Sequence, residues 1–248
     1  MPQPGLIMKY QINGDNLEVV SIQIGGNETI IGEAGALNYM SGNIQMSTGA
    51  EGGFMKSLKR SFSGESFFLT KFRTTGGQGL VAFAGKSPGR ILPLEIQPGK
   101  EYIAQKDAFL CAEEGVDLDI HMQKKLGKGL FGGEGFVLQK LSGTGMAFLH
   151  IPGDLIEKEL KPNQLLKVST GHVAAFEPSV DFNIERTGGI KSSLFSGEGL
   201  FMTTLRGPGK VWLRSMTLQD LASSLKPHLP TGNSSGSSGG MNISFGKK

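Results

Sequence analysis

The chain has 248 residues and a formal net charge of +3, a balance too small to indicate a nucleic-acid partner by itself. Its single cysteine, Cys111, excludes an intrachain disulfide framework and favours a reducing compartment, where such a residue usually fills an apolar core. We recognise no secretory leader and no apolar stretch long enough to cross a bilayer, so we expect a cytoplasmic protein.

Short apolar runs separated by turn residues fill most of the chain. After an extended lead-in over 1–16, turn dipeptides recur at three places: Gly26-Asn27, Pro98-Gly99 and Pro162-Asn163. Runs with a period of two residues follow at 44–46, 116–118 and 180–182, a pattern typical of half-buried strands. With abundant glycine and no long amphipathic segment, the sequence predicts an all-β protein.

A short phrase with a central Gly-Glu pair comes next in each case. It occupies residues 62–67, 131–136 and 195–200, and an aromatic residue leads each copy. Each phrase continues into an apolar run, a glycine-rich turn and a second apolar run, which is the pattern of a β-hairpin. The sequence therefore predicts a hairpin after each phrase.

The two repeated patterns keep the same order along the chain and predict three tandem units. We place unit 1 at about 17–86, unit 2 at 87–152 and unit 3 at 153–215. A unit of this size would bury little surface alone. We therefore predict one domain over 1–230, in which three pseudo-symmetric units form a single barrel-like or prism-like body.

The C-terminal region has a different pattern. Thr217 followed by Asp220 is a helix N-cap signature, and Pro227 ends the run. Three leucines fall on one face of this segment: Leu218, Leu221 and Leu225. We predict a short helix over 217–226 packed on the β body, followed by a flexible Ser/Gly-rich tail over 231–248.

Sequence signatures of catalysis are scarce. The histidines lie at no metal-ligand spacing: His121, His150, His172 and His228. The glycine pattern at 127–132 matches the dinucleotide fingerprint only formally, because a strand follows where that motif requires a helix. We expect no catalytic residue, no bound metal and no cofactor, and therefore a protein that is not an enzyme.

The centres of the three phrases are candidates for a repeated motif: Gly64, Glu65, Gly133, Glu134, Gly197 and Glu198. In a structural interpretation, each carboxylate accepts backbone N–H groups and fixes a tight turn. In a functional interpretation, threefold symmetry gathers the carboxylates near an axis, where they hold a cation or act as acids. One residue type serving three times favours the structural interpretation.

A basic stretch without acidic residues precedes each phrase, although the third stretch is weaker. The candidate residues for contact with an anionic surface are Lys56, Lys59, Arg60, Lys124, Lys125, Lys128 and Lys191. Basic residues among Phe, Leu and Met suit an anionic membrane, where each contributes about 1 kcal/mol. The alternative is a set of solvated loops whose apolar residues turn into the core.

The three-unit plan, the three phrases and the closing Leu-x-x-Leu-Lys-Pro-x-Leu-Pro at 221–230 together resemble the altered-inheritance-of-mitochondria family over about 8–230. The resemblance implies three units that are each similar to the subunit of the tryptophan RNA-binding attenuation protein. It implies no catalytic residues. Fungal members are linked to organisation of the mitochondrial inner membrane, whereas the absence of an Arg-rich presequence favours a bacterial or archaeal member.

We therefore expect a non-enzymatic binding or scaffold protein that acts at an anionic membrane surface or within a homo-oligomer. Its expected partners are other proteins or the membrane. A small-ligand or metal-binding module is the alternative. RNA binding follows only by analogy of fold, because no aromatic-basic RNA motif supports it.

Overall fold

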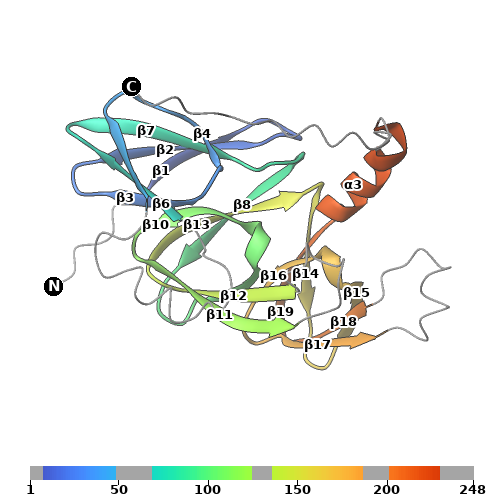
Figure 1. The fold of residues 1–248 in the computed structure, drawn as a ribbon. Coiled ribbons are helices and arrows are strands. Elements are labelled where there is room, and N and C mark those ends of the chain that lie inside the picture. Colours follow the sequence, from blue (N-terminus) through green and yellow to red (C-terminus); the bar gives the residue numbers. More distant parts are fainter. Residues whose placement is uncertain (1–7, 49–68, 125–135, 187–200, 230–248) are drawn as a thin grey trace, which may run out of the picture.

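The computed structural model describes residues 8–48, 69–124, 136–186 and 201–229 (Figure 1). Most of these residues lie in β-strands, and one short α-helix lies near the C-terminus. The predictions of an all-β class and of a short C-terminal helix are confirmed.

After β1 (Lys9–Asn13), six strands fall within each of the three predicted units. Unit 1 holds β2 (Val19–Gly25), β3 (Thr29–Glu33), β4 (Leu37–Met40), β5 (Ile44–Thr48), β6 (Leu69–Thr74) and β7 (Gln78–Ala84). Unit 2 holds β8 (Gly89–Ile96), β9 (Tyr102–Gln105), β10 (Phe109–Glu113), β11 (Val116–Lys124), β12 (Phe136–Gly143) and β13 (Gly145–Pro152). Unit 3 holds β14 (Leu155–Leu160), β15 (Leu165–Ser169), β16 (Val173–Phe176), β17 (Asp181–Arg186), β18 (Phe201–Arg206) and β19 (Gly209–Arg214). Short 3-10 turns, η1 (Lys106–Ala108) and η3 (Thr170–His172), precede β10 and β16.

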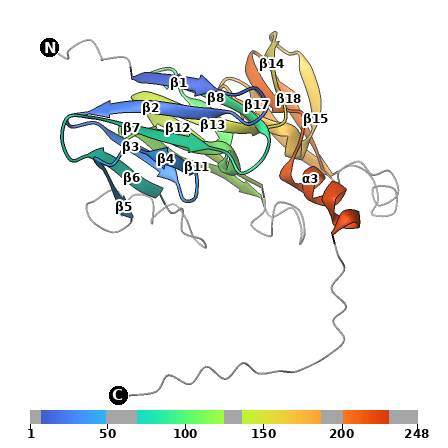
Figure 2. The same cartoon turned by 90° about the horizontal axis from the view of Figure 1, so that it is seen from above.

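The strands form four antiparallel sheets, which we number 1 to 4. Sheet 1 has the order β1-β2-β7-β4, and sheet 2 has the order β5-β6-β3-β10-β13-β8. Sheet 3 has the order β11-β12-β9-β16-β19-β14, and sheet 4 has the order β15-β18-β17. Sheets 1 and 4 lie at opposite ends of the body in both views (Figures 1 and 2).

Apolar layers fill the space between consecutive sheets. Phe83 of sheet 1 packs with Phe72 of sheet 2 in the first layer, with ring centroids 5.1 Å apart. The second layer joins sheets 2 and 3 through residues such as Leu149 and Trp212, and the third joins sheets 3 and 4 through Phe176 and Leu205. Each such buried side chain contributes about 1.5–3 kcal/mol, so the stacking of the sheets rests on these three layers.

The same strand pairing recurs in the three units. The first and third strands of each unit flank the sixth, and the second and fourth flank the fifth. A register shift interrupts the corresponding ladder each time: between Leu37 and Tyr39, between Phe109 and Cys111, and between Val173 and Ala175. Because the bulge fixes the alignment, the corresponding positions include Tyr39, Cys111 and Ala175.

The predicted hairpins are wrong. β12 and β13 follow one another across the turn at 143–145, yet β12 pairs with β9 and β11 in sheet 3, whereas β13 pairs with β8 and β10 in sheet 2. β6 and β7 divide between two sheets in the same way, as do β18 and β19. Gly143 and Gly145 have φ angles of 90° and 137°, which residues with a Cβ rarely adopt, and this turn redirects the chain to another sheet.

Strand pairs between units build the two larger sheets. β3 of unit 1 pairs with β10 of unit 2, and β9 of unit 2 pairs with β16 of unit 3. None of the four sheets closes into a barrel within the part of the chain that the structure describes. The single barrel-like, pseudo-symmetric body therefore stays a prediction.

The C-terminal helix is α3 (Leu218–Leu225), and the short η4 (Lys226–His228) follows it. A capping box links Thr217 and Asp220 at its start, as the sequence predicts. Leu221 is half-buried, whereas Leu218 and Leu225 are 47% and 49% exposed, so the expected packing of all three leucines on the β body is wrong. In the described ranges, no helix has the length and apolar character needed to span a membrane.

Candidate functional site

Almost all site residues proposed from the sequence fall outside the described residues. These are the phrase residues Gly64, Glu65, Gly133, Glu134, Gly197 and Glu198, and the basic residues Lys56, Lys59, Arg60, Lys125, Lys128 and Lys191. Lys124 is the last residue of β11. Segments 49–68, 125–135 and 187–200 join corresponding strands: β5 to β6, β11 to β12 and β17 to β18.

The described residues offer a different candidate, the outer face of sheet 1. Along β2, Ile22 faces the apolar layer under the sheet, so its neighbours Ser21 and Gln23 face outward. The register of β1 on β2 places Gln11 opposite Ser21, and the register of β7 on β2 places Leu80 opposite Gln23. Residues of β1, β2 and β7 therefore share this face, and Tyr39 of β4 lines it as well.

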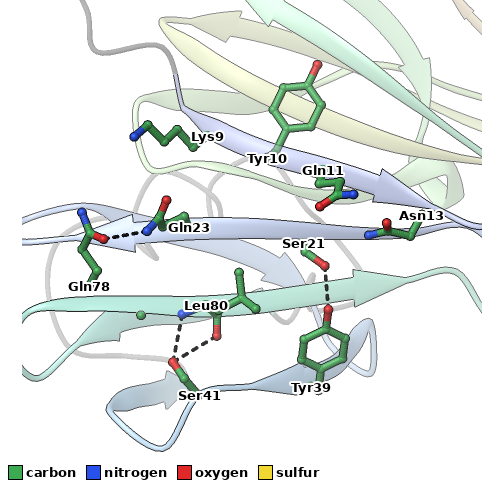
Figure 3. Close-up of a pocket in the computed structure, with 11 residues that line it drawn as sticks. Lys9, Tyr10, Gln11, Asn13, Ser21, Gln23, Tyr39, Ser41, Gln78 and Leu80 are labelled. Carbon is green, nitrogen blue, oxygen red and sulfur yellow. Dashed lines mark hydrogen bonds between the residues drawn. The ribbon is translucent and has the colours of Figure 1, made fainter.

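A pocket of about 700 Å³ lies on this face (Figure 3). Its lining includes Gln11, Asn13, Ser21, Gln23, Tyr39 and Gln78. Among the described residues that line it, Lys9 alone is charged. The lining thus combines amide, hydroxyl and aromatic groups over an open sheet surface.

Hydrogen bonds between the lining residues fix several of their side chains. The Tyr39 and Ser21 hydroxyl oxygens lie 2.7 Å apart, and Gln23 Nε2 donates to Gln78 Oε1 at 2.6 Å (Figure 3). Ser41 Oγ accepts the backbone N–H of Leu80 at 2.9 Å. Amides and hydroxyls both donate and accept, so this surface can match a polar partner of either kind.

A side-chain hydrogen bond recurs in the three units near the start of the strand that follows the sheet-to-sheet turn. Glu113 accepts the N–H of Met146 at 2.5 Å, and Glu177 accepts the N–H of Lys210 at 2.9 Å. Ser41 takes this role for Leu80 in unit 1. This is the turn-fixing role that the sequence analysis assigned to the phrase glutamates, but the side chains that perform it here stand just after β4 and β16 and at the end of β10. The acidic residues Glu113 and Glu177, at corresponding positions of the sequence, are the signal that could have predicted this contact.

Two buried polar residues lie at corresponding ends of β13 and β19. Burial lowers the pKa of His150, whose Nε2–H donates to the Ser87 carbonyl at 3.0 Å. Burial likewise lowers the pKa of Arg214, whose Nε donates to the Gly171 carbonyl at 2.6 Å and whose guanidinium also donates to Gln105. Both groups have backbone or side-chain partners, so they tie strand ends to neighbouring turns.

Metal ligands do not gather in the described ranges. No group of three or more His, Cys, Asp or Glu side chains there is arranged to hold a metal ion. Cys111 is fully buried, and burial raises its pKa well above the ordinary value, so its thiol stays protonated. The interpretation of Cys111 as a core residue is confirmed.

The family model described as mitochondrial biogenesis AIM24 matches residues 10–216 of this chain. The chain belongs to this family. An uncharacterized protein of Streptococcus pyogenes serotype M6 is 30% identical over 221 residues, which cover 86% of this chain and 87% of the relative. The crystal structure of a Streptococcus pyogenes protein has a TM-score of 0.74 and 26% identity, covering 90% of this chain and all of that chain.

For this AIM24 family member, the outer face of sheet 1 leaves only a weak trace in the sequence. Lys9, Gln11 and Asn13 alternate with Tyr10 and Ile12, as expected for a strand with one polar face. From the sequence we predicted only an extended lead-in over 1–16, without a polar face. The approach of Tyr39 to Ser21 depends on strand order and could not be read from spacing.

Proposed function

We propose that this AIM24 family member is a non-enzymatic binding or scaffold protein whose binding surface is the outer face of sheet 1. The observation that carries the proposal is the exposure of Tyr39. Its side chain is 46% exposed, whereas Cys111 and Ala175 at the two corresponding bulges are both 0% exposed. The face that an adjoining sheet covers in units 2 and 3 thus stands open in unit 1 among the described residues.

The chemistry of this face suits contact with a macromolecule. Tyr39 and Leu80 supply apolar area, and Gln23 and Gln78 supply hydrogen-bonding groups beside them. Tyrosine is enriched in protein interfaces because it combines a large apolar ring with a polar end. We infer that the partner is a protein surface.

A photo-cross-linking amino acid at position 39 tests the proposal in the cells that contain the protein. We expect covalent adducts on irradiation, because Tyr39 lies at the centre of the proposed contact. The matched control carries the same group at Asp119, an exposed residue of β11 in sheet 3. Equal adduct yields at positions 39 and 119, or none at 39, contradict the proposal.

The scaffold itself, in this proposal, consists of three copies of one module arranged with pseudo-threefold symmetry. The repeated pairing and the bulges at Tyr39, Cys111 and Ala175 support this. Separate superposition of unit 2 on unit 3 in an experimental structure tests it. Unrelated paths of corresponding strands contradict it.

An anionic membrane surface is the second candidate partner, and the placement of the basic segments favours it. The stretches that hold Lys56 and Lys125 join corresponding strands of units 1 and 2. We place the protein at the cytoplasmic side of such a membrane, in agreement with its single, buried cysteine. Flotation with anionic vesicles at low salt is expected to carry the protein, and equal recovery with neutral vesicles contradicts this candidate.

A further inference from the structure

Two internal strand pairs show how one unit joins the next. β3 pairs with β10, with Gly32 opposite Cys111 and Ile31 opposite Ala112. β9 pairs with β16, with Ala104 opposite Ala175. Each junction therefore joins the second strand of one unit to the third strand of the unit that follows.

Two strands have no neighbouring unit within the chain with which to form such a junction. β15 is the second strand of unit 3, and β4 is the third strand of unit 1. Both are edge strands in the described part of the chain, although both counterparts of each are internal. Their exposed side chains agree: Met40 is 37% exposed, whereas its counterparts Ala112 and Phe176 are 0% and 2% exposed. Within the described ranges, the chain makes this pairing twice, and β15 and β4 are further copies of its two strands that are not paired in this way.

The two free edges do not lie together in one chain. β4 borders sheet 1 and β15 borders sheet 4, and these sheets occupy opposite ends of the body (Figures 1 and 2). Exposed edges offer unpaired N–H and C=O groups to another chain. A second copy of this protein carries the matching edge.

We propose that β15 of one copy pairs antiparallel with β4 of a second copy and joins the chains head to tail. The inference rests on the proposed role of sheet 1 in binding and names the partner of that face. It extends sheet 1 of one copy by sheet 4 of the other. Because the two surfaces differ, the contact is heterologous and leads to a ring or an open chain of copies.

The internal junctions also fix the register of the contact. Val168 pairs with Thr203, and Ala104 pairs with Gln139, which is the counterpart of Thr203 in unit 2. Val168 therefore corresponds to Ala104, which pairs with Ala175 at the β9–β16 junction. Tyr39 corresponds to Ala175, so Val168 of one copy comes to lie opposite Tyr39 of the other. Met40 then lies opposite Lys167.

Hydrogen bonding tells which of these pairs has the closer side chains. The N–H of Glu114 donates to the Thr29 carbonyl at 3.1 Å at the β10–β3 junction. Pair types alternate along an antiparallel ladder, so Cys111 and Gly32 form a non-hydrogen-bonded pair. The corresponding Tyr39–Val168 pair has the same character, with Cα atoms about 4.5 Å apart, which is within the range of a disulfide.

The contact completes the wall of the pocket on sheet 1. Side chains opposite one another in a ladder point to the same face, so Val168 of the second copy lies beside Tyr39 on the pocket side. Leu166 of that copy follows it on the same face, next to Ser41. In the assembly, these residues of the second copy join Tyr39 of β4 and Ser41 in lining the pocket.

Mixed disulfide formation tests both the partner and the register. One preparation of the full chain carries Tyr39→Cys, and a second preparation, with a tag that changes its mass, carries Val168→Cys. We expect mild oxidation of the mixture to give the mixed dimer in several-fold excess over either self-linked dimer. The wild-type chain is the control for background, since its only cysteine is buried.

Each other outcome overturns the proposal. Monomers alone mean that the edges do not meet, and Tyr39→Cys chains linked mainly to one another mean a symmetric contact in place of the head-to-tail one. A mixed dimer that forms equally well with Lys167→Cys, whose side chain points to the opposite face, excludes this register. If position 39 cross-links in cells to a different protein while the mixed disulfide fails, the proposed function stands and this inference does not.

Discussion

The carboxylate of Glu177 accepts the backbone N–H of Lys210 at 2.9 Å, where β19 begins. Glu113 holds Met146 in the same way at the start of β13. The chain changes sheets just before both residues, so each carboxylate fixes the strand as it enters a new sheet. Side-chain acceptors of this kind satisfy a backbone donor that the sheet ladder leaves unpaired.

Replacing Glu113 by alanine is expected to lower the free energy of unfolding by about 1–3 kcal/mol, because the N–H of Met146 loses its acceptor in a half-buried site. Denaturant unfolding followed by the fluorescence of the single tryptophan, Trp212, measures the change. Asp119→Ala, at an exposed position of β11, is the control and should change stability little. Equal effects of the two substitutions contradict the role of Glu113.

His150 is expected to make stability depend on pH below neutrality. Burial lowers its folded-state pKa below 6.5, so the unfolded chain binds a proton that the folded chain does not. The stability contribution is complete above the unfolded pKa and is lost as pH falls through 6.5 toward the folded pKa, by at most about 1.4 kcal/mol per pH unit.

Unfolding free energies of wild type and His150→Gln, measured at several pH values from neutral to mildly acidic, test this slope. The variant is expected to lose less stability on acidification than wild type, whatever its stability at neutral pH. His121→Gln alters an exposed histidine and serves as the control. Parallel pH profiles for wild type and His150→Gln would refute the assignment.

The buried side-chain amide of Gln139 is expected to lower the stability of the protein relative to an apolar side chain at this position. Its side chain is 1% exposed, and neither its Nε2 nor its Oε1 has a hydrogen-bond partner among the described residues. Its counterpart Thr203 is equally buried but donates to Thr170 Oγ1 at 3.1 Å. An unpaired buried amide costs about 1–3 kcal/mol, so Gln139→Met should raise the melting temperature. Gln123→Met, at an exposed position, controls for added apolar surface, and a lower melting temperature for Gln139→Met contradicts this reading.

Lys167→Pro is expected to prevent self-association without unfolding the chain. Lys167 corresponds to Ile31, whose N–H faces the neighbouring unit, so proline removes a donor from the free edge of β15 and leaves the β15–β18 ladder intact. Light scattering should report assembly for wild type and for Lys167→Ala, which keeps the N–H, but not for Lys167→Pro. Assembly of the proline variant as large as that of wild type excludes the proposed edge.

The all-β class, the C-terminal helix and the family could be predicted because they leave local signals. Thr217 and Asp220 mark the start of α3 through their own side chains. The hairpins after the phrases could not be judged correctly, since two apolar runs around Gly143 and Gly145 fit a hairpin and a sheet-to-sheet corner equally well. Strand partners decide between them, and partners are set by packing far along the chain.

The candidate site could not be predicted from the sequence, because it too depends on which strands become neighbours. Tyr39 has an ordinary strand neighbourhood in sequence, and it is exposed because it lies on the outer face of sheet 1, whereas Cys111 lies in the apolar layer between sheets 1 and 2. The leucines of α3 show the converse limit. Their spacing identifies a helix face but does not say whether another element covers it.

Hydrogen exchange at the β4 and β15 edges tests the account most directly. The amides of Met40 and Lys167 face the proposed contact, so we expect their exchange in the wild-type protein to slow as protein concentration rises. In the Lys167→Pro variant, we expect the exchange of the Met40 amide to stay fast at every concentration. Amides at the β3–β10 and β9–β16 junctions should be protected at every concentration. The claim that sheet 1 is completed by a second copy is contradicted if the Met40 and Lys167 amides of the wild-type protein exchange fast at all concentrations. In that case the Met40 amide exchanges at the same rate in wild type and in Lys167→Pro.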